Sequence, residues 1–142
     1  MTAPTNAPMR ALILDTNIVL DAFVFSDAAA SSLKPALLDG KHQWIATQPM
    51  RDELERVLAY PQIVPRLVFY HVTAADVLAQ FDHFVQMEPV APKASVTCQD
   101  PDDQKFIDLA IAHQAILLSK DNAVLAMKKR LLGFGSQAQN AL

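Results

Sequence analysis

The sequence has almost no cysteine, and this excludes two kinds of scaffold. Its single cysteine, Cys98, cannot form an internal disulfide or a cysteine-rich zinc cage, because both need further thiols. A catalytic thiol would need a nearby base, and although His113 follows in the sequence, no pattern places it beside Cys98. We therefore expect Cys98 to be a small buried or half-buried apolar residue.

Long apolar runs are also missing. No stretch approaches the roughly 18 apolar residues that a membrane-spanning helix needs. Residues 1–9 are rich in Thr, Pro and Ala and lack the basic-then-apolar order of a secretory signal, so we expect a cytoplasmic protein without membrane contact. Internal repeats and low-complexity linkers are absent as well, and 142 residues with a hydrophobic share of 51% predict one globular domain.

Positive charge is not in excess, which limits how the chain can bind nucleic acid. Lys and Arg number 12 against 15 Asp and Glu, giving a net charge of −3. A protein that binds nucleic acid by bulk electrostatics is usually basic. If nucleic acid is the substrate, the acids must be concentrated at one site and offset by metal. The one basic cluster, residues 128–130, is a candidate phosphate contact, although such a run more often forms the cationic last turn of a helix.

Apolar runs alternate with helical patterns along the chain. We expect strands over residues 10–15, 42–47 and 115–119, and helices over 48–60, 73–86, 100–113 and 124–132. Residues 18–38 predict two helices or one interrupted helix. This alternation predicts an α/β fold of three α/β/α layers around a mostly parallel central sheet. Residues 1–9 are expected to be a flexible tail, 10–132 the domain, and 133–142 a tail or a poorly formed last strand.

Two of the expected strands end in an aspartate, Asp15 and Asp121. Either acid alone would have a simple structural explanation, because Asp also initiates turns and caps helices. In open α/β sheets, however, ligands bind outside the carboxyl ends of the strands. The coincidence of two such acids therefore favours a site at this edge of the sheet.

Helical acids can be assigned to faces by their rotation of about 100° per residue. Asp103 lies near the centre of the apolar stripe of its helix, whereas Asp102 and Asp108 lie outside the stripe. A buried carboxylate must be paired, hydrogen-bonded, protonated or metal-bound, although free N–H groups in the first helical turn could also satisfy Asp103. In the helix over 48–60, Glu53 flanks the apolar stripe and is the best candidate for an inward-facing acid.

Gathered together, these four acids would repel one another strongly. Divalent cations resolve this conflict, and an all-oxygen set of ligands favours Mg²⁺ or Mn²⁺. The four histidines show no spacing typical of zinc ligands. The predicted metal ligands and catalytic residues are Asp15, Glu53, Asp103 and Asp121.

Four segments then point to a family. They are LILDTNIVLDAF at 12–23, RDELERVLAYPQI at 51–63, CQDPDDQKFIDLAIAH at 98–113, and ILLSKDNAVL at 116–125. In this order the sequence resembles PIN-domain ribonucleases, in particular the stand-alone toxin components of bacterial toxin–antitoxin pairs. The resemblance assigns the family's four acids, in chain order, to the four acids above. It adds three supporting polar residues, which are Thr16, Asn17 and Ser119.

The resemblance implies a divalent-metal-dependent endoribonuclease that hydrolyses phosphodiester bonds of single-stranded or looped RNA. It also implies a homodimer and a small antitoxin protein that blocks the acidic cleft. Many relatives carry another acid two positions after the fourth, where this chain has Ala123, so a second metal ion is conditional. Two alternatives stay open. One is a magnesium-dependent phosphohydrolase with Asp15 as nucleophile, whose motif has an acid where this chain has Asn17. The other is a non-catalytic RNA- or partner-binding PIN-like module.

Overall fold

The structure is a computed structural model that describes residues 9–142. Apart from Met9, the expected N-terminal tail lies outside the described residues. Within them the chain forms five strands, which are β1 (Arg10–Leu14), β2 (His42–Ala46), β3 (Gln86–Met87), β4 (Ile116–Leu118) and β5 (Gln137–Gln139). The helices are α1 (Thr16–Phe23), α2 (Leu33–Leu38), α3 (Gln48–Leu58), α4 (Val64–Phe69), α5 (Ala74–Phe84), α6 (Gln104–His113), α7 (Asn122–Leu125) and α8 (Lys128–Leu132). Two 3₁₀ turns are η1 (Ala28–Ala30) and η2 (Pro101–Asp103).

The described strands form one sheet in the order β3-β2-β1-β4-β5, and every pair is parallel. The predicted α/β architecture is therefore confirmed, with a sheet that is parallel throughout. The central strand β1 pairs with β2 on one side and β4 on the other, and Leu14 lies opposite Leu118. Parallel neighbours end at the same edge, so the residues that follow β1 and β4 come together there.

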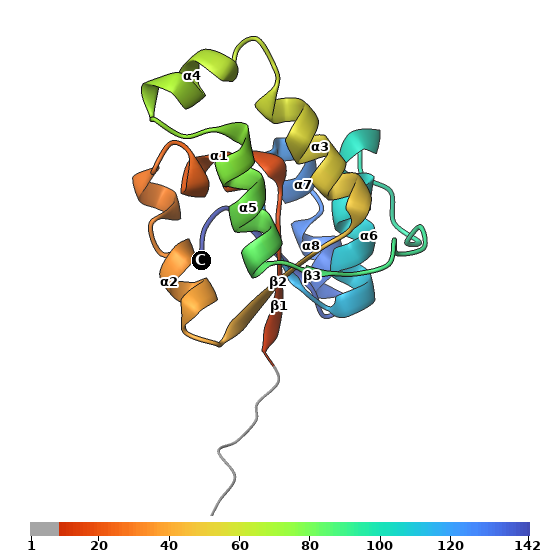
Figure 1. The fold of residues 1–142 in the computed structure, drawn as a ribbon. Coiled ribbons are helices and arrows are strands. Elements are labelled where there is room, and N and C mark those ends of the chain that lie inside the picture. Colours follow the sequence, from red (N-terminus) through yellow and green to blue (C-terminus); the bar gives the residue numbers. More distant parts are fainter. Residues whose placement is uncertain (1–8) are drawn as a thin grey trace, which may run out of the picture.

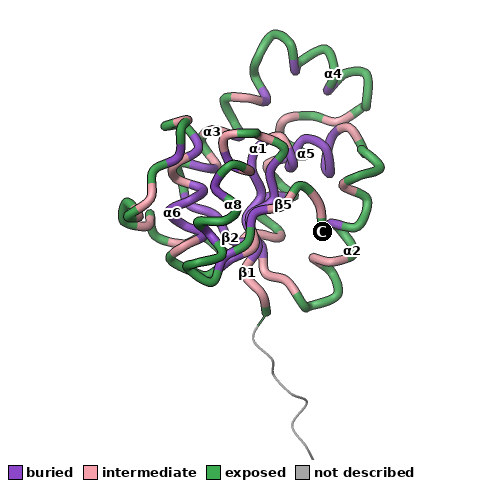
Figure 2. The backbone as a smooth tube through the Cα atoms, turned by 180° about the vertical axis from the view of Figure 1, so that it is seen from behind, coloured by how far each residue is buried: buried purple, intermediate pink, exposed green. Residues whose placement is uncertain are grey.

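Helices cover both faces of the sheet, as a parallel sheet requires. Figures 1 and 2 show α2 and α5 on one side and α6 and α8 on the other. The helix α4 stands out from the body of the fold in both views. No helix among residues 9–142 is both long and apolar enough to cross a bilayer.

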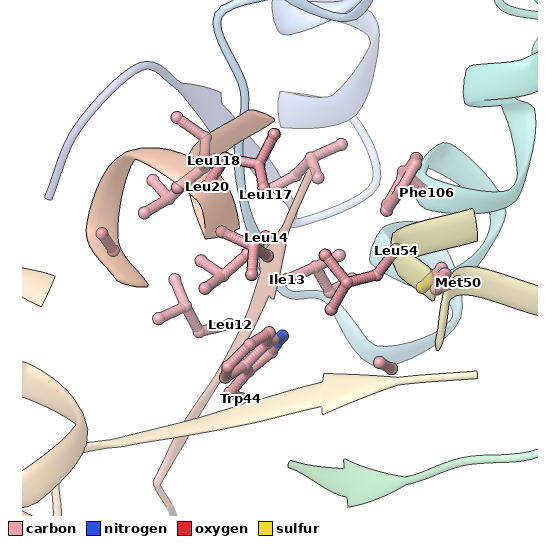
Figure 3. Close-up of a cluster of buried hydrophobic side chains, with 14 of the residues drawn as sticks. Leu12, Ile13, Leu14, Leu20, Trp44, Met50, Leu54, Phe106, Leu117 and Leu118 are labelled. Atoms are coloured by element: carbon pink, nitrogen blue, oxygen red, sulfur yellow. The ribbon is translucent and has the colours of Figure 1, made fainter. Parts of the chain in front are cut away.

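The core lies on both sides of β1, whose side chains alternate between the two layers. Figure 3 shows Leu12 and Leu14 directed toward the side of Leu20, while Ile13 points toward Leu54 and Phe106. Leu12 and Ile13 have no exposed surface. This two-sided burial explains why β1 reads as a continuous apolar run instead of an alternating one.

Two expected helix starts are confirmed in detail. The Thr73 hydroxyl accepts a hydrogen bond from the N–H of Asp76, whose carboxylate accepts the N–H of Thr73 in return, forming a complete capping box. The Asp100 carboxylate accepts the N–H of Asp102, so Asp100 caps η2 with Pro101 at the first position. These local signals are strong because both partners lie within three residues of each other.

Two of the expected helices differ from those in the structure. The helix over 73–86 ends at Phe84, because Val85 turns to an extended conformation and Gln86–Met87 pairs with the edge of β2. The helix over 124–132 is two helices, α7 and α8, separated by a tight turn in which the N–H of Met127 bonds the carbonyl of Val124. The helix α4 is not among the elements expected from the sequence.

Of the two possibilities for residues 133–142, the structure has the strand. β5 pairs with β4 from Ile116↔Gln137 to Leu118↔Gln139. Only Ala138 of the strand is buried, because an edge strand presents one face to the core. The buried Ser136 hydroxyl donates to the carbonyl of Ala110 at 2.7 Å and fixes the start of the strand to α6.

Candidate functional site

The site is built at the carboxyl ends of β1 and β4. The N–H of Asp15 donates to the Leu118 carbonyl at 2.9 Å, which continues the ladder one residue beyond the strands. The Ser119 hydroxyl then donates to Asp15 Oδ2 at 2.6 Å and accepts the N–H of Asp121 at 2.9 Å. Ser119 has no exposed surface, so this hydroxyl is a fixed bridge between the two strand-end acids.

Both strand-end acids also cap helices. Asp15 Oδ1 accepts the N–H of Thr16 at 2.7 Å at the start of α1, and Asp121 Oδ1 accepts the N–H of Ala123 at 2.8 Å at the start of α7. The capping role and a role in a site are therefore compatible, because each carboxylate keeps lone pairs beyond those used by its cap. Capping also fixes the direction of each side chain.

Asp103 reaches the same place from α6. It is the last residue of η2 and the N-cap residue of α6, and it is only 7% exposed. Its carboxylate makes no capping bond to the helix, and Oδ2 is buried without a hydrogen-bond partner among the described residues. The structural explanation in which free N–H groups satisfy Asp103 is therefore wrong. A buried carboxylate oxygen without a donor is costly unless the group is protonated or binds a cation.

The structure brings three of the four predicted acids together. One ligand atom each from Asp15, Asp103 and Asp121 can be chosen so that all lie within 4.8 Å of one another. Burial, followed by the charge of Asp15 and the proximity of Asp121, raises the pKa of Asp103 from 3.8 to about 8. Burial also raises the pKa of Asp15, against the opposing effect of the Ser119 hydrogen bond. Without a cation the cluster therefore retains a proton near neutral pH.

The fourth predicted acid, Glu53, lies beside this group and not within it. Its Oε2 accepts the Thr16 hydroxyl, and its Oε1 forms an ion pair with Lys105 Nζ at 2.7 Å. Because the N–H of Thr16 bonds Asp15, Thr16 connects Glu53 to the three-acid cluster. Lys105 was missed by the sequence interpretation, since a lysine in the first turn of a helix carries no sign of an inward contact.

The other predicted supporting residue, Asn17, is half-buried. Its Oδ1 is buried without a hydrogen-bond partner among the described residues, and the structure shows no bond from Asn17 to the carboxylates. It lines an adjoining cleft together with Lys120, which forms an ion pair with the buried Asp21. Thr16 and Ser119 thus contact the acids directly, whereas Asn17 lies next to them.

The residues at this edge fit a divalent cation. Asp15, Asp103 and Asp121 would hold it, because their oxygen atoms converge and Asp103 Oδ2 has no hydrogen-bond partner in the part of the chain that the structure describes. An all-carboxylate set favours a hard cation over zinc. The fold and the site together define a class: a parallel α/β domain with a cluster of three carboxylates at the carboxyl edge of its sheet.

Comparisons with known proteins narrow this class. The model of the PIN domain family matches residues 11–123, and the chain belongs to that family. A chain of similar fold occurs in the crystal structure of VapBC2 from Rickettsia felis, in which VapBC2 is bound to a DNA fragment from its promoter. The TM-score between the two chains is 0.61, and their sequences are 14% identical. The match covers 90% of this chain and 96% of that one. Comparison with curated protein sequences returned no significant match.

Proposed function

We propose that this protein is a divalent-metal-dependent endoribonuclease that hydrolyses phosphodiester bonds in single-stranded or looped RNA. The observation that carries the proposal is the cluster of Asp15, Asp103 and Asp121, with a buried Asp103 oxygen that has no hydrogen-bond partner within residues 9–142. Three carboxylates at this distance are costly in the absence of a cation. PIN-family membership supports a nuclease, and the all-oxygen ligand set supports Mg²⁺ or Mn²⁺.

The roles of the residues follow from their contacts. When bound, a divalent cation would activate water and stabilise negative charge on a phosphodiester. Asp15, Asp103 and Asp121 are the ligands of the cation. Ser119 fixes the relative positions of Asp15 and Asp121 through its two hydrogen bonds. Thr16 and Lys105 hold Glu53 at the side of the cluster, where its carboxylate can orient a water molecule or bind a second cation. In this proposal Glu53 is the fourth acid of the site, and it lies outside the group of three cation ligands.

The cellular setting is part of the same proposal. We infer that the protein is the toxin of a cytoplasmic toxin–antitoxin pair, acting as a homodimer that a small antitoxin inhibits. The sequence resemblance to such toxins supports this, as does the similarity in fold to a chain of the VapBC2 structure. Sedimentation of the purified protein tests the dimer. Co-expression with the product of an adjoining short reading frame tests the antitoxin, which should co-purify with the protein and suppress RNA cleavage.

The catalytic proposal is tested with purified protein and a labelled single-stranded RNA in Mn²⁺ or Mg²⁺. EDTA should abolish cleavage, and Asp103→Asn should lower the rate by about 100-fold or more, the scale expected for losing one main electrostatic contribution. The matched control is Asp102→Asn, one residue away but exposed and outside the cluster. We expect this control to cleave at the wild-type rate within about twofold. Cleavage that survives both EDTA and Asp103→Asn contradicts the proposal.

A further inference from the structure

A polar cleft adjoins the carboxylate cluster and has no assigned role. Its volume is ≈ 440 Å³, and two of its lining residues, Asn17 and Lys120, are close chain neighbours of Asp15 and Asp121. Other lining residues come from the segment after α1 and from α4, the helix that projects from the fold in Figure 1. The cleft therefore extends from the carboxylate edge toward the projecting helix.

On the α4 side of the cleft, Arg66 and Tyr70 both pack against Phe25, and the Tyr70 and Phe25 rings are tilted at 49° to each other. The Arg66 guanidinium lies 3.6 Å from the centroid of the Phe25 ring. The centroids of the Tyr70 and Phe25 rings are 5.7 Å apart. Tyr70 is 37% exposed, so part of this residue is accessible from solvent. Because Arg66 stacks on a ring, its outer edge keeps N–H donors in the planar fork that suits phosphate.

The charged residues of the cleft other than Arg66 have partners within the protein. Lys120 pairs with the buried Asp21, yet its side chain is 48% exposed and an ammonium has three donors. The Asp27 carboxylate accepts the N–H of Ala29 at the start of η1, so this acid has a local partner. Among the described residues no carboxylate forms an ion pair with Arg66, which leaves its charge available for a ligand.

We propose that this cleft binds an unpaired segment of an RNA substrate, with a phosphate at Arg66 and a base stacked on Tyr70. The proposal rests on the ribonuclease function above and names how its substrate is held. Base stacking on an aromatic ring combined with cationic contacts is the usual way in which proteins hold single strands. Bases inside a duplex are already stacked on each other, so the same contacts select against double-stranded RNA.

The proposal also accounts for substrate binding by an acidic protein. With a net charge of −3 the chain cannot rely on bulk attraction, and the proposed cleft instead uses few phosphate contacts and a stacking contact. The salt dependence of binding should therefore be shallow. Removing one phosphate contact to a single strand should change the slope of log affinity against log salt by about 0.7.

The test is fluorescence anisotropy of a fluorescein-labelled single-stranded oligoribonucleotide in EDTA, where it stays intact. We expect Tyr70→Ala to raise Kd by about 5- to 100-fold and Tyr70→Phe to leave it near the wild-type value. Arg66→Ala should reduce the salt slope by about 0.7, whereas Arg66→Lys should keep it. Thermal unfolding of each variant, followed by circular dichroism, shows whether its fold is intact.

The matched controls lie outside the cleft lining. Tyr60 is 42% exposed, close to the value for Tyr70, and Arg130 lies on α8 in the basic cluster. Tyr60→Ala and Arg130→Ala should leave Kd and the salt slope unchanged. A weakening by Arg130→Ala equal to that of Arg66→Ala would assign binding to the basic cluster and overturn the proposal.

Three other results overturn it: no RNA binding by the wild-type protein, equal affinity for a hairpin duplex, or unchanged Kd in folded Arg66→Ala and Tyr70→Ala. In the last case the cleft is free for another occupant, such as a peptide of a partner protein. The ribonuclease proposal fails separately, when wild-type protein binds RNA through the cleft but does not cleave it with Mn²⁺. If the wild-type protein cleaves RNA and the cleft variants keep the wild-type Kd, only the proposal about the cleft is refuted.

Discussion

The raised pKa of Asp103 predicts that the metal-free protein loses stability as the pH rises. In the folded protein, burial and the neighbouring carboxylates raise the pKa of this group to about 8. In the unfolded chain it returns to about 3.9. A group whose pKa is raised on folding contributes stability that is fully present below the unfolded value. That contribution is lost as the pH rises from the unfolded pKa to the folded pKa, because in this range the unfolded chain releases the proton and the folded protein retains it.

The magnitude follows from the width of this window. Each pH unit inside it costs about 1.4 kcal/mol, so moving from about pH 5 to about pH 8 should lower the free energy of unfolding by roughly 4 kcal/mol. That is a large share of the 5–15 kcal/mol or so typical of a domain. Asp15, whose pKa is also raised by burial, adds to the trend with the same sign.

The assay is urea denaturation followed by circular dichroism, in EDTA, across this pH range. Asp103→Asn removes the titrating group, so its stability should change with pH much less than that of the wild type, whereas Asp102→Asn should follow the wild type. Saturating Mn²⁺ should restore wild-type stability at the alkaline end, because a ligand that binds only the folded state stabilises it. Parallel pH profiles of wild type and Asp103→Asn would refute the assigned electrostatics.

Three further predictions concern neighbouring contacts. Ser119→Ala removes the bridge between Asp15 and Asp121 and should lower the free energy of unfolding by about 1–3 kcal/mol and weaken Mn²⁺ binding, as measured by urea denaturation and calorimetry. Lys105→Met leaves Glu53 without its cation; since both side chains keep some exposure, the stability loss should be about 1 kcal/mol or less, with a clear fall in RNA cleavage rate. Thr73→Ala breaks the capping box of α5 and should cost about 1 kcal/mol in urea denaturation without changing cleavage; a change in cleavage would link α5 to the site.

Much of the site was predictable because its signals are local. The apolar runs of β1 and β4 are buried on both faces, so their ends and the acids after them stand out in the sequence. Asp103 was assigned inward from helical rotation alone, and it is buried in the structure. The convergence of the three acids then follows from parallel strand topology, which places both strand ends at one edge.

Features that depend on distant segments were not predictable. Asp108 lies outside the apolar stripe of α6, yet it is buried, because the loop before η2 folds over it and the N–H of Ala94 donates to its carboxylate. Gln104 also bonds Asp108 and holds the same loop. The edge strands β3 and β5 are short and partly polar, and only pairing with β2 and β4 defines them. The ion pair of Lys105 with Glu53 joins two helices far apart in sequence.

The proposed cation site lies among Asp15, Asp103 and Asp121. A crystal of the protein grown with Mn²⁺, with diffraction recorded to locate anomalous scattering from manganese, tests it most directly. We expect an anomalous peak bounded by these three carboxylates, and we expect it to be absent in Asp103→Asn crystals grown in the same way. Manganese bound elsewhere, or no peak among the three carboxylates at saturating Mn²⁺, would contradict it.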